Sequence, residues 1–172
     1  KSSFQIRGHK DEDARMNIMS FLDERAITTD VKAHGSKEEV IHELVGLLAN
    51  AGAIKEKDVG KLVQILMKRE SLGSTGIGQG VAIPHGKSDC VTKLVAAFGV
   101  SRAGINFDSL DGEPASLFFL LVAPEDSAGP HLKALARISR LLKDKHFRES
   151  LRAAKDEQTL TRIIQEEDER RH

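Results

Sequence analysis

Early in the chain, apolar residues recur at intervals of three and four, the spacing of a helix with one buried face. This stripe consists of Val40, Ile41, Leu44, Val45, Leu47 and Leu48. Ser36 and Glu39 have the spacing of a capping box at its start, and Gly52 is expected to end it. Residues 58–68 repeat the helical spacing, with Asp58 in a capping position. The pattern therefore predicts two consecutive amphipathic helices.

Beyond the second helix, the period changes to that of strands. The runs VAI at 81–83, KLVAAFGVS at 93–101 and ASLFFLLVA at 115–123 are short, apolar and rich in β-branched or aromatic residues. The last run is apolar almost throughout, which is typical of a strand buried on both faces. The segment INFDSLDGE at 105–113 is expected to be an edge strand that ends in a Leu-Asp-Gly turn.

The rest of the chain returns to helical spacing. Pro130 suits the first position of a helix. One face of that helix is predicted to carry Leu132, Leu135, Ala136, Ser139 and Leu142. Helix is expected to continue to about residue 154, and DEQTLTRIIQEEDERR closes the chain, with EEDERRH as a solvated end. Helices, then strands, then helices around one apolar sheet predict a single, layered α/β domain.

Composition narrows the classes of function. At 172 residues, the chain is long enough for one domain with a full core. Its 26 Lys and Arg balance its 26 Asp and Glu, so we expect neither nucleic-acid binding nor attraction to an anionic membrane. Trp and Tyr are absent, which removes the usual stacking platforms. No apolar stretch is long enough for membrane insertion.

Cysteine usage and the chain start add two expectations. Cys90 is the single cysteine, which excludes an internal disulfide and a cysteine-based zinc site and favours the reducing cytoplasm. The chain begins at Lys1, and Met16 or Met19 would serve as a start. We therefore expect 1–15 to be an N-terminal extension or a vector-derived remnant, and 16–172 to be the domain.

The glycine-rich stretch STGIGQGVAIPHGKS, residues 74–88, carries the candidate chemistry. It is not a phosphate loop of the nucleotide-binding kind, because five residues rather than four separate Gly80 from Gly86. The dinucleotide fingerprint fails too, since Val81 stands where its third glycine belongs. What remains is a short strand followed by Pro84, His85 and Gly86. Local composition suits a rigidly presented histidine and, equally, a histidine packed in an ordinary turn.

A longer pattern separates these alternatives. The run from Glu70 through Ile77 and Gly78 to VAIPHG at 81–86 resembles the active-site motif of fructose/mannitol-type (type-2) enzyme IIA domains of the bacterial phosphotransferase system. The string LGSTGIGQGVAIPHGK is most similar to the nitrogen-regulatory branch. FLDERAI, ASLFFLLVAPED and HLKALARISRLL follow in family order, so the resemblance covers roughly residues 19–166. It implies a three-layer α/β/α domain with a mixed central sheet.

The resemblance also implies roles for individual residues. His85 would accept a phosphoryl group from a histidine phosphocarrier protein, on Nε2 if this chain follows the family, with the other nitrogen held by a backbone acceptor. His131 and Arg69 match the family's supporting positions and would stabilise that group. Support for the phosphate from Ser74, Thr75, Gly76 and Gly86 is a further expectation. No metal or cofactor is expected, because donor and acceptor are both imidazoles.

Other titratable residues have plainer explanations. His34, His42 and His146 are expected to be exposed, without metal-ligand spacing. Asp108 and Asp111 straddle a turn, and Lys87 is expected at the rim of the site. Nothing around Cys90 indicates a lowered thiol pKa.

Two functions are compatible with this resemblance, and a third stays open. The domain is a regulatory relay whose target is a kinase or a potassium transport protein, or it is a sugar-uptake component that donates phosphate to a cysteine of enzyme IIB. The lead-in GSTGIG favours regulation. The third is a binding module that no longer accepts phosphate. In the first two cases the chain is a phosphocarrier rather than an independent catalyst, with an apolar collar around His85 as its docking face.

Overall fold

A six-stranded mixed sheet forms the centre of the computed structural model, which describes residues 16–171. The order is β1 (Leu22–Thr28), β5 (Val95–Ile105), β6 (Ala115–Ala123), β3 (Val81–Ala82) and β2 (Gly76–Gly78). The short β4 (His85–Lys87) pairs with β6 beyond β3, on the same side. β5 and β6 are antiparallel, as are β2 and β3, and the other pairs are parallel. The expected segment 1–15 lies outside the described residues.

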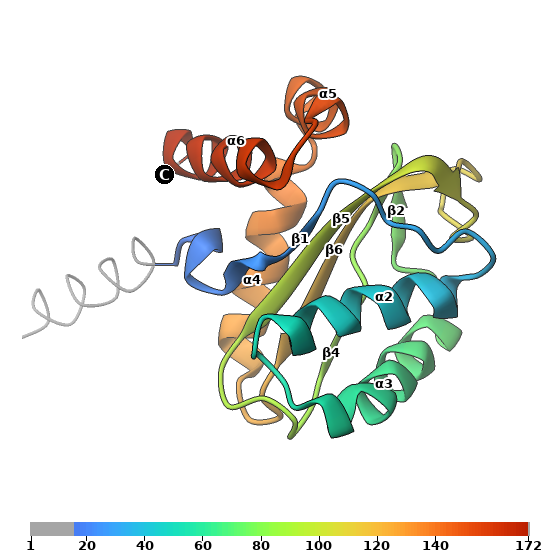
Figure 1. Ribbon diagram of the computed structural model, residues 1–172, viewed down its shortest axis with the longest axis vertical. Helices are drawn as coiled ribbons and strands as arrows, with labels where there is room; N and C mark the ends of the chain where they lie inside the picture. The colour runs from blue at the N-terminus through green and yellow to red at the C-terminus, as the bar shows by residue number, and fades with distance from the viewer. Residues whose placement is uncertain (1–15, 172) are drawn as a thin grey trace, which may run out of the picture.

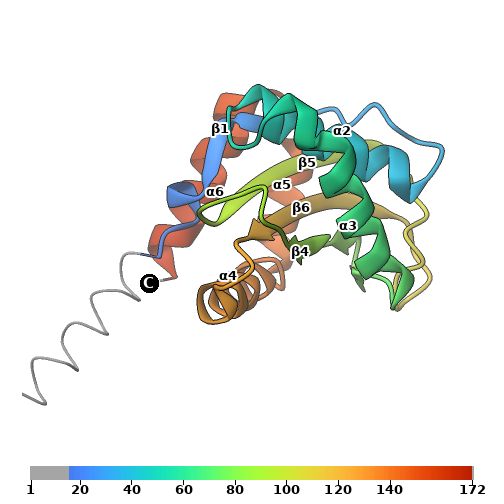
Figure 2. The same cartoon turned by 90° about the horizontal axis from the view of Figure 1, so that it is seen from below.

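Helices cover both faces of this sheet (Figures 1 and 2). One layer holds α2 (Lys37–Asn50) and α3 (Val59–Ser71), and the other holds α4 (Ala128–Leu141), α5 (Lys145–Ala153) and α6 (Glu157–Arg170). Short 3₁₀ turns span Ile18–Ser20 and Glu56–Asp58. The three-layer prediction is therefore confirmed.

Strand β6 shows why the sheet has a core on each side. Phe118, Leu120 and Val122 pack in the core beneath α2 and α3. Leu117, Phe119 and Leu121 pack in the opposite core with α4, α5 and α6. Successive side chains of a strand point to opposite faces, so an almost wholly apolar strand supplies both layers at once. The predicted bounds of this strand, 115–123, are confirmed.

The first two helices agree with the sequence pattern, with one change at each start. Ser36 Oγ accepts from the backbone N–H of Glu39 at 3.2 Å, but the Glu39 carboxylate accepts from Gly35 rather than from Ser36. Asp58 precedes α3, yet its side chain makes no capping hydrogen bond. Gly52 has φ +77° just past the end of α2, a conformation that glycine adopts without strain.

The prediction of an edge strand at 105–113 is wrong. Only Ile105 belongs to a strand, the end of β5, and the segment after it is a loop. Side chains replace the ladder there: Asn106 Oδ1 accepts from the N–H of Asp108 at 3.0 Å, and Asp111 Oδ1 from that of Glu113 at 3.0 Å. Such local bonds compete with strand pairing. Of the two aspartates expected at the turn, Asp111 bonds the loop backbone, whereas the carboxylate of Asp108 pairs with Lys37.

The predicted start of α4 is also wrong, and its predicted apolar face agrees only in part with the buried one. The helix begins at Ala128, so Pro130 is its third residue, not its first. The buried residues are His131, Ala134, Ile138 and Leu141, while Leu132 is 67% exposed. Of the predicted face, Leu142 is buried and Leu135 packs against the core, whereas Leu132 and Ala136 are exposed and His131 was left out. A histidine belongs to the buried face of this helix.

The C-terminal end of α6 is less solvated than predicted. Glu167 and Asp168 are buried, and Asp168 accepts from the guanidinium of Arg137 at 2.5 Å and from the backbone N–H of Ile18 at 2.7 Å. These bonds join α6 to α4 and to the segment before β1. One residue of the charged run, Asp168, therefore fastens the N-terminal end of the domain, whereas Glu167 accepts from Arg170 and Arg171.

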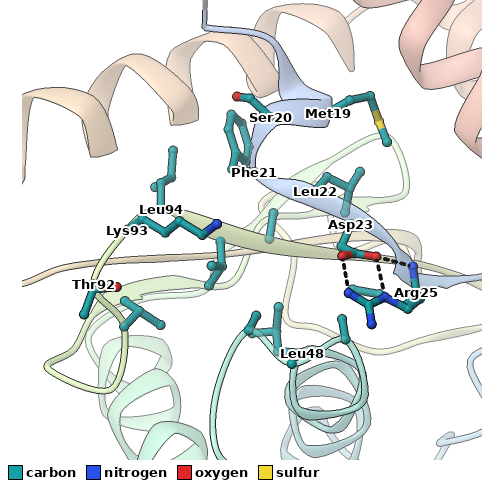
Figure 3. Close-up of a pocket in the computed structure, with 17 residues that line it drawn as sticks. Met19, Ser20, Phe21, Leu22, Asp23, Arg25, Leu48, Thr92, Lys93 and Leu94 are labelled. Carbon is teal, nitrogen blue, oxygen red and sulfur yellow. Dashed lines mark hydrogen bonds and ion pairs between the residues drawn. The ribbon is translucent and has the colours of Figure 1, made fainter.

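The sequence patterns predicted no strand at 22–28. Its register with β5 shifts between Leu22 and Ile27, where the strand bulges. Asp23 Oδ1 accepts from the N–H of Arg25 at 2.8 Å, and both carboxylate oxygens contact its guanidinium (Figure 3). Burial along the strand is irregular as a result, so no period-2 pattern marks it.

Candidate functional site

His85 lies where Pro84 interrupts the strand that runs beside β6. The Ile83 N–H donates to the Thr75 carbonyl at 3.0 Å, away from β6. Pro84 has no N–H to donate, but its carbonyl accepts from Leu121 at 2.9 Å and restores the pairing. β4 then begins at His85. The half-buried imidazole is thus fixed at a break in the sheet rather than on a mobile loop.

The backbone fixes the tautomer of His85. Its Nδ1 lies 2.6 Å from the Ile83 carbonyl oxygen, which only accepts hydrogen bonds. Nδ1 must therefore carry the hydrogen, and in the neutral ring the lone pair is on Nε2. Within residues 16–171, no hydrogen bond occupies that Nε2. This arrangement provides a nucleophilic nitrogen in a defined orientation.

His131 lies against this ring from the opposite helix layer. Their ring centroids are 5.6 Å apart and their planes are inclined by 73°. His131 is the fourth residue of α4, not the second as predicted, and is 6% exposed. Its Nε2 is buried and has no hydrogen-bond partner among the described residues. An unpaired buried polar atom is costly, and such atoms in folded proteins call for a functional explanation.

Both imidazoles have a lowered pKa, which favours the neutral form. Burial lowers the pKa of His85 most, and the charge of Arg69 lowers it further. The hydrogen bond to the Ile83 carbonyl and the charge of Glu70 raise it. Burial also lowers the pKa of His131, as do the charges of His85 and Lys87. A neutral His85 keeps its lone pair, and a neutral His131 avoids repulsion between two imidazolium ions.

Arg69 lies close enough to act on His85 electrostatically. It is the eleventh residue of α3, half-buried, and its Nη1 donates to the carbonyl of Gly73 at 2.7 Å. A guanidinium has five N–H donors, so this single bond leaves others for an anion. The structure thus brings together three predicted residues: His85 and His131 in ring contact, and Arg69 within electrostatic reach.

The glycine-rich loop is held by its own hydrogen bonds. Ser74 Oγ donates to the Phe107 carbonyl and accepts from the N–H of Gly76 at 2.9 Å. The N–H and hydroxyl of Thr75 both donate to Glu70. A Cβ on Gly76 would lie 2.3 Å from Ser109 Oγ, so only glycine fits there. These contacts shape the loop, and a direct contact with phosphate stays a prediction.

Gly86 lies in β4 with its Cβ position directed at α3. A Cβ there would lie 3.4 Å from Leu66 Cδ2 and 3.5 Å from Ile65 Cγ2, which is ordinary contact. Its support of a phosphoryl group stays a prediction.

Glu70 begins the motif, but the sequence pattern assigned it no role. It is 5% exposed and accepts from Lys37 Nζ at 3.0 Å as well as from Thr75. Lys37 also contacts Asp108 at 3.1 Å. One carboxylate therefore joins α2, the end of α3 and the loop before His85. The one sequence feature that could have indicated this role is the position of Glu70, just before a glycine-rich loop.

The remaining candidates lie apart from this site. His34, His42 and His146 are exposed, as expected. No three metal-ligating side chains gather anywhere in residues 16–171. A cavity of about 430 Å³ lies between β1, the end of α2 and residues 91–96, and none of its lining residues is part of the histidine pair (Figure 3). Over the same described residues, no helix has the length and apolarity that crossing a membrane requires.

Comparison with known proteins assigns the family to which this fold belongs. Residues 20–167 match the family model described as "Phosphoenolpyruvate-dependent sugar phosphotransferase system, EIIA 2". The chain belongs to this family, the type-2 enzyme IIA domains. The resemblance and the fold that the sequence predicted are thereby confirmed.

Individual relatives come from both branches of the family. A nitrogen regulatory protein of Bradyrhizobium diazoefficiens is 40% identical over 87% of this chain and 95% of its own length. A fructose-specific EIIABC component of Bacillus subtilis is 39% identical, but this chain spans only 24% of that protein's length. The crystal structure of IIA-Ntr from Neisseria meningitidis has a TM-score of 0.76 at 37% identity, covering 86% of this chain and 98% of that one.

Proposed function

We propose that this protein is a phosphohistidine relay that accepts a phosphoryl group on His85 Nε2 from a histidine phosphocarrier protein. The observation that carries the proposal is the 2.6 Å contact between His85 Nδ1 and the Ile83 carbonyl. It leaves Nε2 with the lone pair, and the unpartnered Nε2 of His131 is buried on the neighbouring ring.

The transfer step needs no proton to move. The Nε2 lone pair attacks phosphorus, the N–P bond of the donor histidine breaks, and its electron pair stays on the donor nitrogen. The His85 ring gains positive charge as the Nε2–P bond forms. The Ile83 carbonyl, still bonded to Nδ1–H, and the nearby charge of Glu70 both favour that charge. The reaction is reversible, because donor and acceptor are the same chemical group.

Catalysis of this step rests on position and charge. His131, as the Nε2–H tautomer, would donate to a phosphoryl oxygen and so satisfy its buried nitrogen. Arg69 would supply a charged donor from the end of α3. Leu132, which follows His131 and is 67% exposed, and Leu72, 81% exposed just beyond α3, would form part of the apolar docking face for the phosphocarrier.

Regulation of a target protein is the first candidate for the role of the phosphorylated chain. In support, the nitrogen regulatory protein of Bradyrhizobium diazoefficiens is almost fully covered by this chain. The Neisseria IIA-Ntr structure also has a higher TM-score, 0.76, than the Escherichia coli mannitol IIA, 0.68. On this proposal the two phosphorylation states of the chain differ in affinity for a target, a kinase or a potassium transport protein.

Sugar uptake is the second candidate, favoured by a separate observation. A fructose-specific EIIA component of Haloferax volcanii is 37% identical over 76% of this chain and 84% of its own length. In that case the phosphoryl group would pass from His85 to a cysteine of an enzyme IIB.

Phosphoryl uptake tests the shared step. The protein is mixed with enzyme I, phosphocarrier and phosphoenolpyruvate, and its intact mass is followed, beside His85→Gln and the exposed control His34→Gln. One acid-labile phosphoryl group is expected on the wild type and the control, and none on His85→Gln. If the wild type takes up no phosphoryl group from a phosphocarrier that phosphorylates another IIA, the chain would instead be a binding module that does not accept phosphate. A fructose-type IIB is then added: transfer of the phosphoryl group to it would favour sugar uptake, and no transfer would favour regulation.

A further inference from the structure

A second cavity, of about 400 Å³, lies at the end of the sheet where β5 gives way to β6. Its wall consists of residues 100–104, Pro114, Ser116 and Arg152. None of these residues belongs to the histidine site. The volume is within the range of small-molecule sites. Its charged and hydroxyl-bearing lining residues are Arg102, Arg152, Ser101 and Ser116.

The fold makes room for Arg152. Its Nε donates to Ser116 Oγ at 2.9 Å, and its Nη2 to the Gln79 carbonyl at 2.9 Å. Gly80 has φ +80°, and a Cβ there would lie 2.3 Å from Arg152 Nη2. Any side chain at position 80 would therefore displace the guanidinium. The absence of a side chain at Gly80 therefore lets the Arg152 guanidinium lie at the edge of the sheet.

Arg102 enters the same wall from β5. Its Nη1 donates to the carbonyl of Arg152 at 2.7 Å, and its Nη2 to that of Ala154 at 2.8 Å. Each of the two guanidinium groups thus uses two of its five N–H donors on neutral oxygens. Within residues 16–171, neither group forms an ion pair with a carboxylate.

Arg152 carries its charge beside a second arginine, Arg148, and the carboxylate of Glu149 offsets this only in part. Burial lowers the pKa of Arg152, and the charge of Arg148 lowers it further, whereas the charge of Glu149 raises it. Glu149 is exposed and pairs with Lys145. Arg148 itself is buried and donates to the carbonyls of Leu142 and Lys143. An anion in the cavity would relieve this repulsion.

We propose that this cavity binds a small anion that carries a phosphate group or paired carboxylates, held by the forks of Arg102 and Arg152 and by the serine hydroxyls. Planar guanidinium forks match both kinds of anion, and charge-assisted hydrogen bonds are the strong ones. Because Arg152 also holds the Gln79 carbonyl, the anion acts on the turn between β2 and β3, six residues before His85.

Chemical-shift mapping tests the site without relying on phosphorylation. Amide spectra are recorded as inorganic phosphate or citrate is added at constant ionic strength; with no Trp or Tyr, the chain has no useful intrinsic fluorescence. Saturable shifts are expected at Ser101, Arg102, Ser116 and Gln79. A response to phosphate alone identifies a phosphate ester as ligand, and a response to citrate alone a polycarboxylate.

Charge variants decide whether the cavity holds the anion. Arg102→Gln is expected to raise the dissociation constant about tenfold, as loss of a charge-assisted hydrogen bond does. The exposed Arg162→Gln, which makes the same change of net charge, is expected to leave it unchanged. Arg102→Lys keeps the positive charge but loses the planar guanidinium, and it is expected to bind the anion more weakly than the wild type does. It is the variant to use if Arg102→Gln does not fold.

Three results would overturn the proposal. They are the absence of saturable shifts with either anion, shifts centred on His85 and His131, and equal weakening by Arg102→Gln and Arg162→Gln.

Discussion

The ring of His131 meets the ring of His85 edge to face, with centroids 5.6 Å apart, and its buried Nε2 has no partner among the described residues. One ring comes from a break in the sheet and the other from the first turn of α4. Folding thus leaves a buried ring nitrogen unsatisfied beside a nitrogen that carries a lone pair. A phosphoryl group on His85 would resolve that imbalance.

His131→Ala is therefore expected to slow phosphoryl uptake about 10²-fold, the usual effect of removing one preorganised donor. His131→Gln, which keeps an N–H donor, is expected to recover part of the rate. Single-turnover transfer from phosphorylated carrier measures both, and thermal unfolding confirms that each variant folds. An unchanged rate in His131→Ala would remove His131 from the mechanism.

The lowered pKa values of His85 and His131 predict how stability depends on pH. Unfolded histidine has a pKa of about 6.5, and both folded values are lower. As the pH falls from about 6.5 toward the folded-state values, the unfolded chain binds protons first, so the free energy of unfolding decreases and then levels off. Denaturant unfolding across this range measures the slope. Replacing both residues by Gln should flatten it, and an unchanged slope would contradict the assignment.

Glu70→Gln is expected to lower the free energy of unfolding by about 1–3 kcal/mol, because Lys37 and Thr75 lose a buried, charged acceptor. The loop before His85 should become more mobile with it. The exposed Glu166→Gln, in α6, is the matched control and should change stability by less than about 0.5 kcal/mol. Urea unfolding compares the two; equal effects would mean that Glu70 does not hold the loop.

Two glycines give opposite expectations for the same substitution. A Cβ on Gly99 would lie 2.5 Å from Val31 Cγ2 and 3.1 Å from Leu44 Cδ2, so Gly99→Ala should destabilise by about 1–3 kcal/mol. Gly46, inside α2, has nothing within 4 Å of its Cβ position, so Gly46→Ala should stabilise by about 0.5–1 kcal/mol. Thermal unfolding measures both variants, and a change of stability in the same direction for the two would contradict this packing.

Much of the fold was predictable, because its main elements bury regular apolar patterns. The stripe from Val40 to Leu48 and the run 115–123 needed no tertiary information. β1 lacked such a pattern, since the Asp23 carboxylate replaces part of its ladder. The loop after Ile105 was misassigned for a related reason: its aspartate and asparagine side chains bond their own backbone.

The candidate site was predictable in its residues but not in its geometry. His85, His131 and Arg69 followed from a motif, yet the face of α4 was assigned from apolar side chains alone and so excluded His131. Only the packing of α4 on β6 shows that this histidine is buried. The role of Glu70 was missed because it depends on a contact with Lys37, which is distant in the sequence, as well as on the nearby Thr75.

The most direct test of the relay is the identity of the phosphorylated nitrogen. Long-range proton–nitrogen NMR spectra of the ¹⁵N-labelled protein, recorded after phosphorylation by enzyme I and the phosphocarrier, resolve the two ring nitrogens of His85. We expect phosphorus on Nε2 and a hydrogen retained on Nδ1, against the Ile83 carbonyl. Phosphorus on Nδ1, or on another histidine, would contradict the proposed relay.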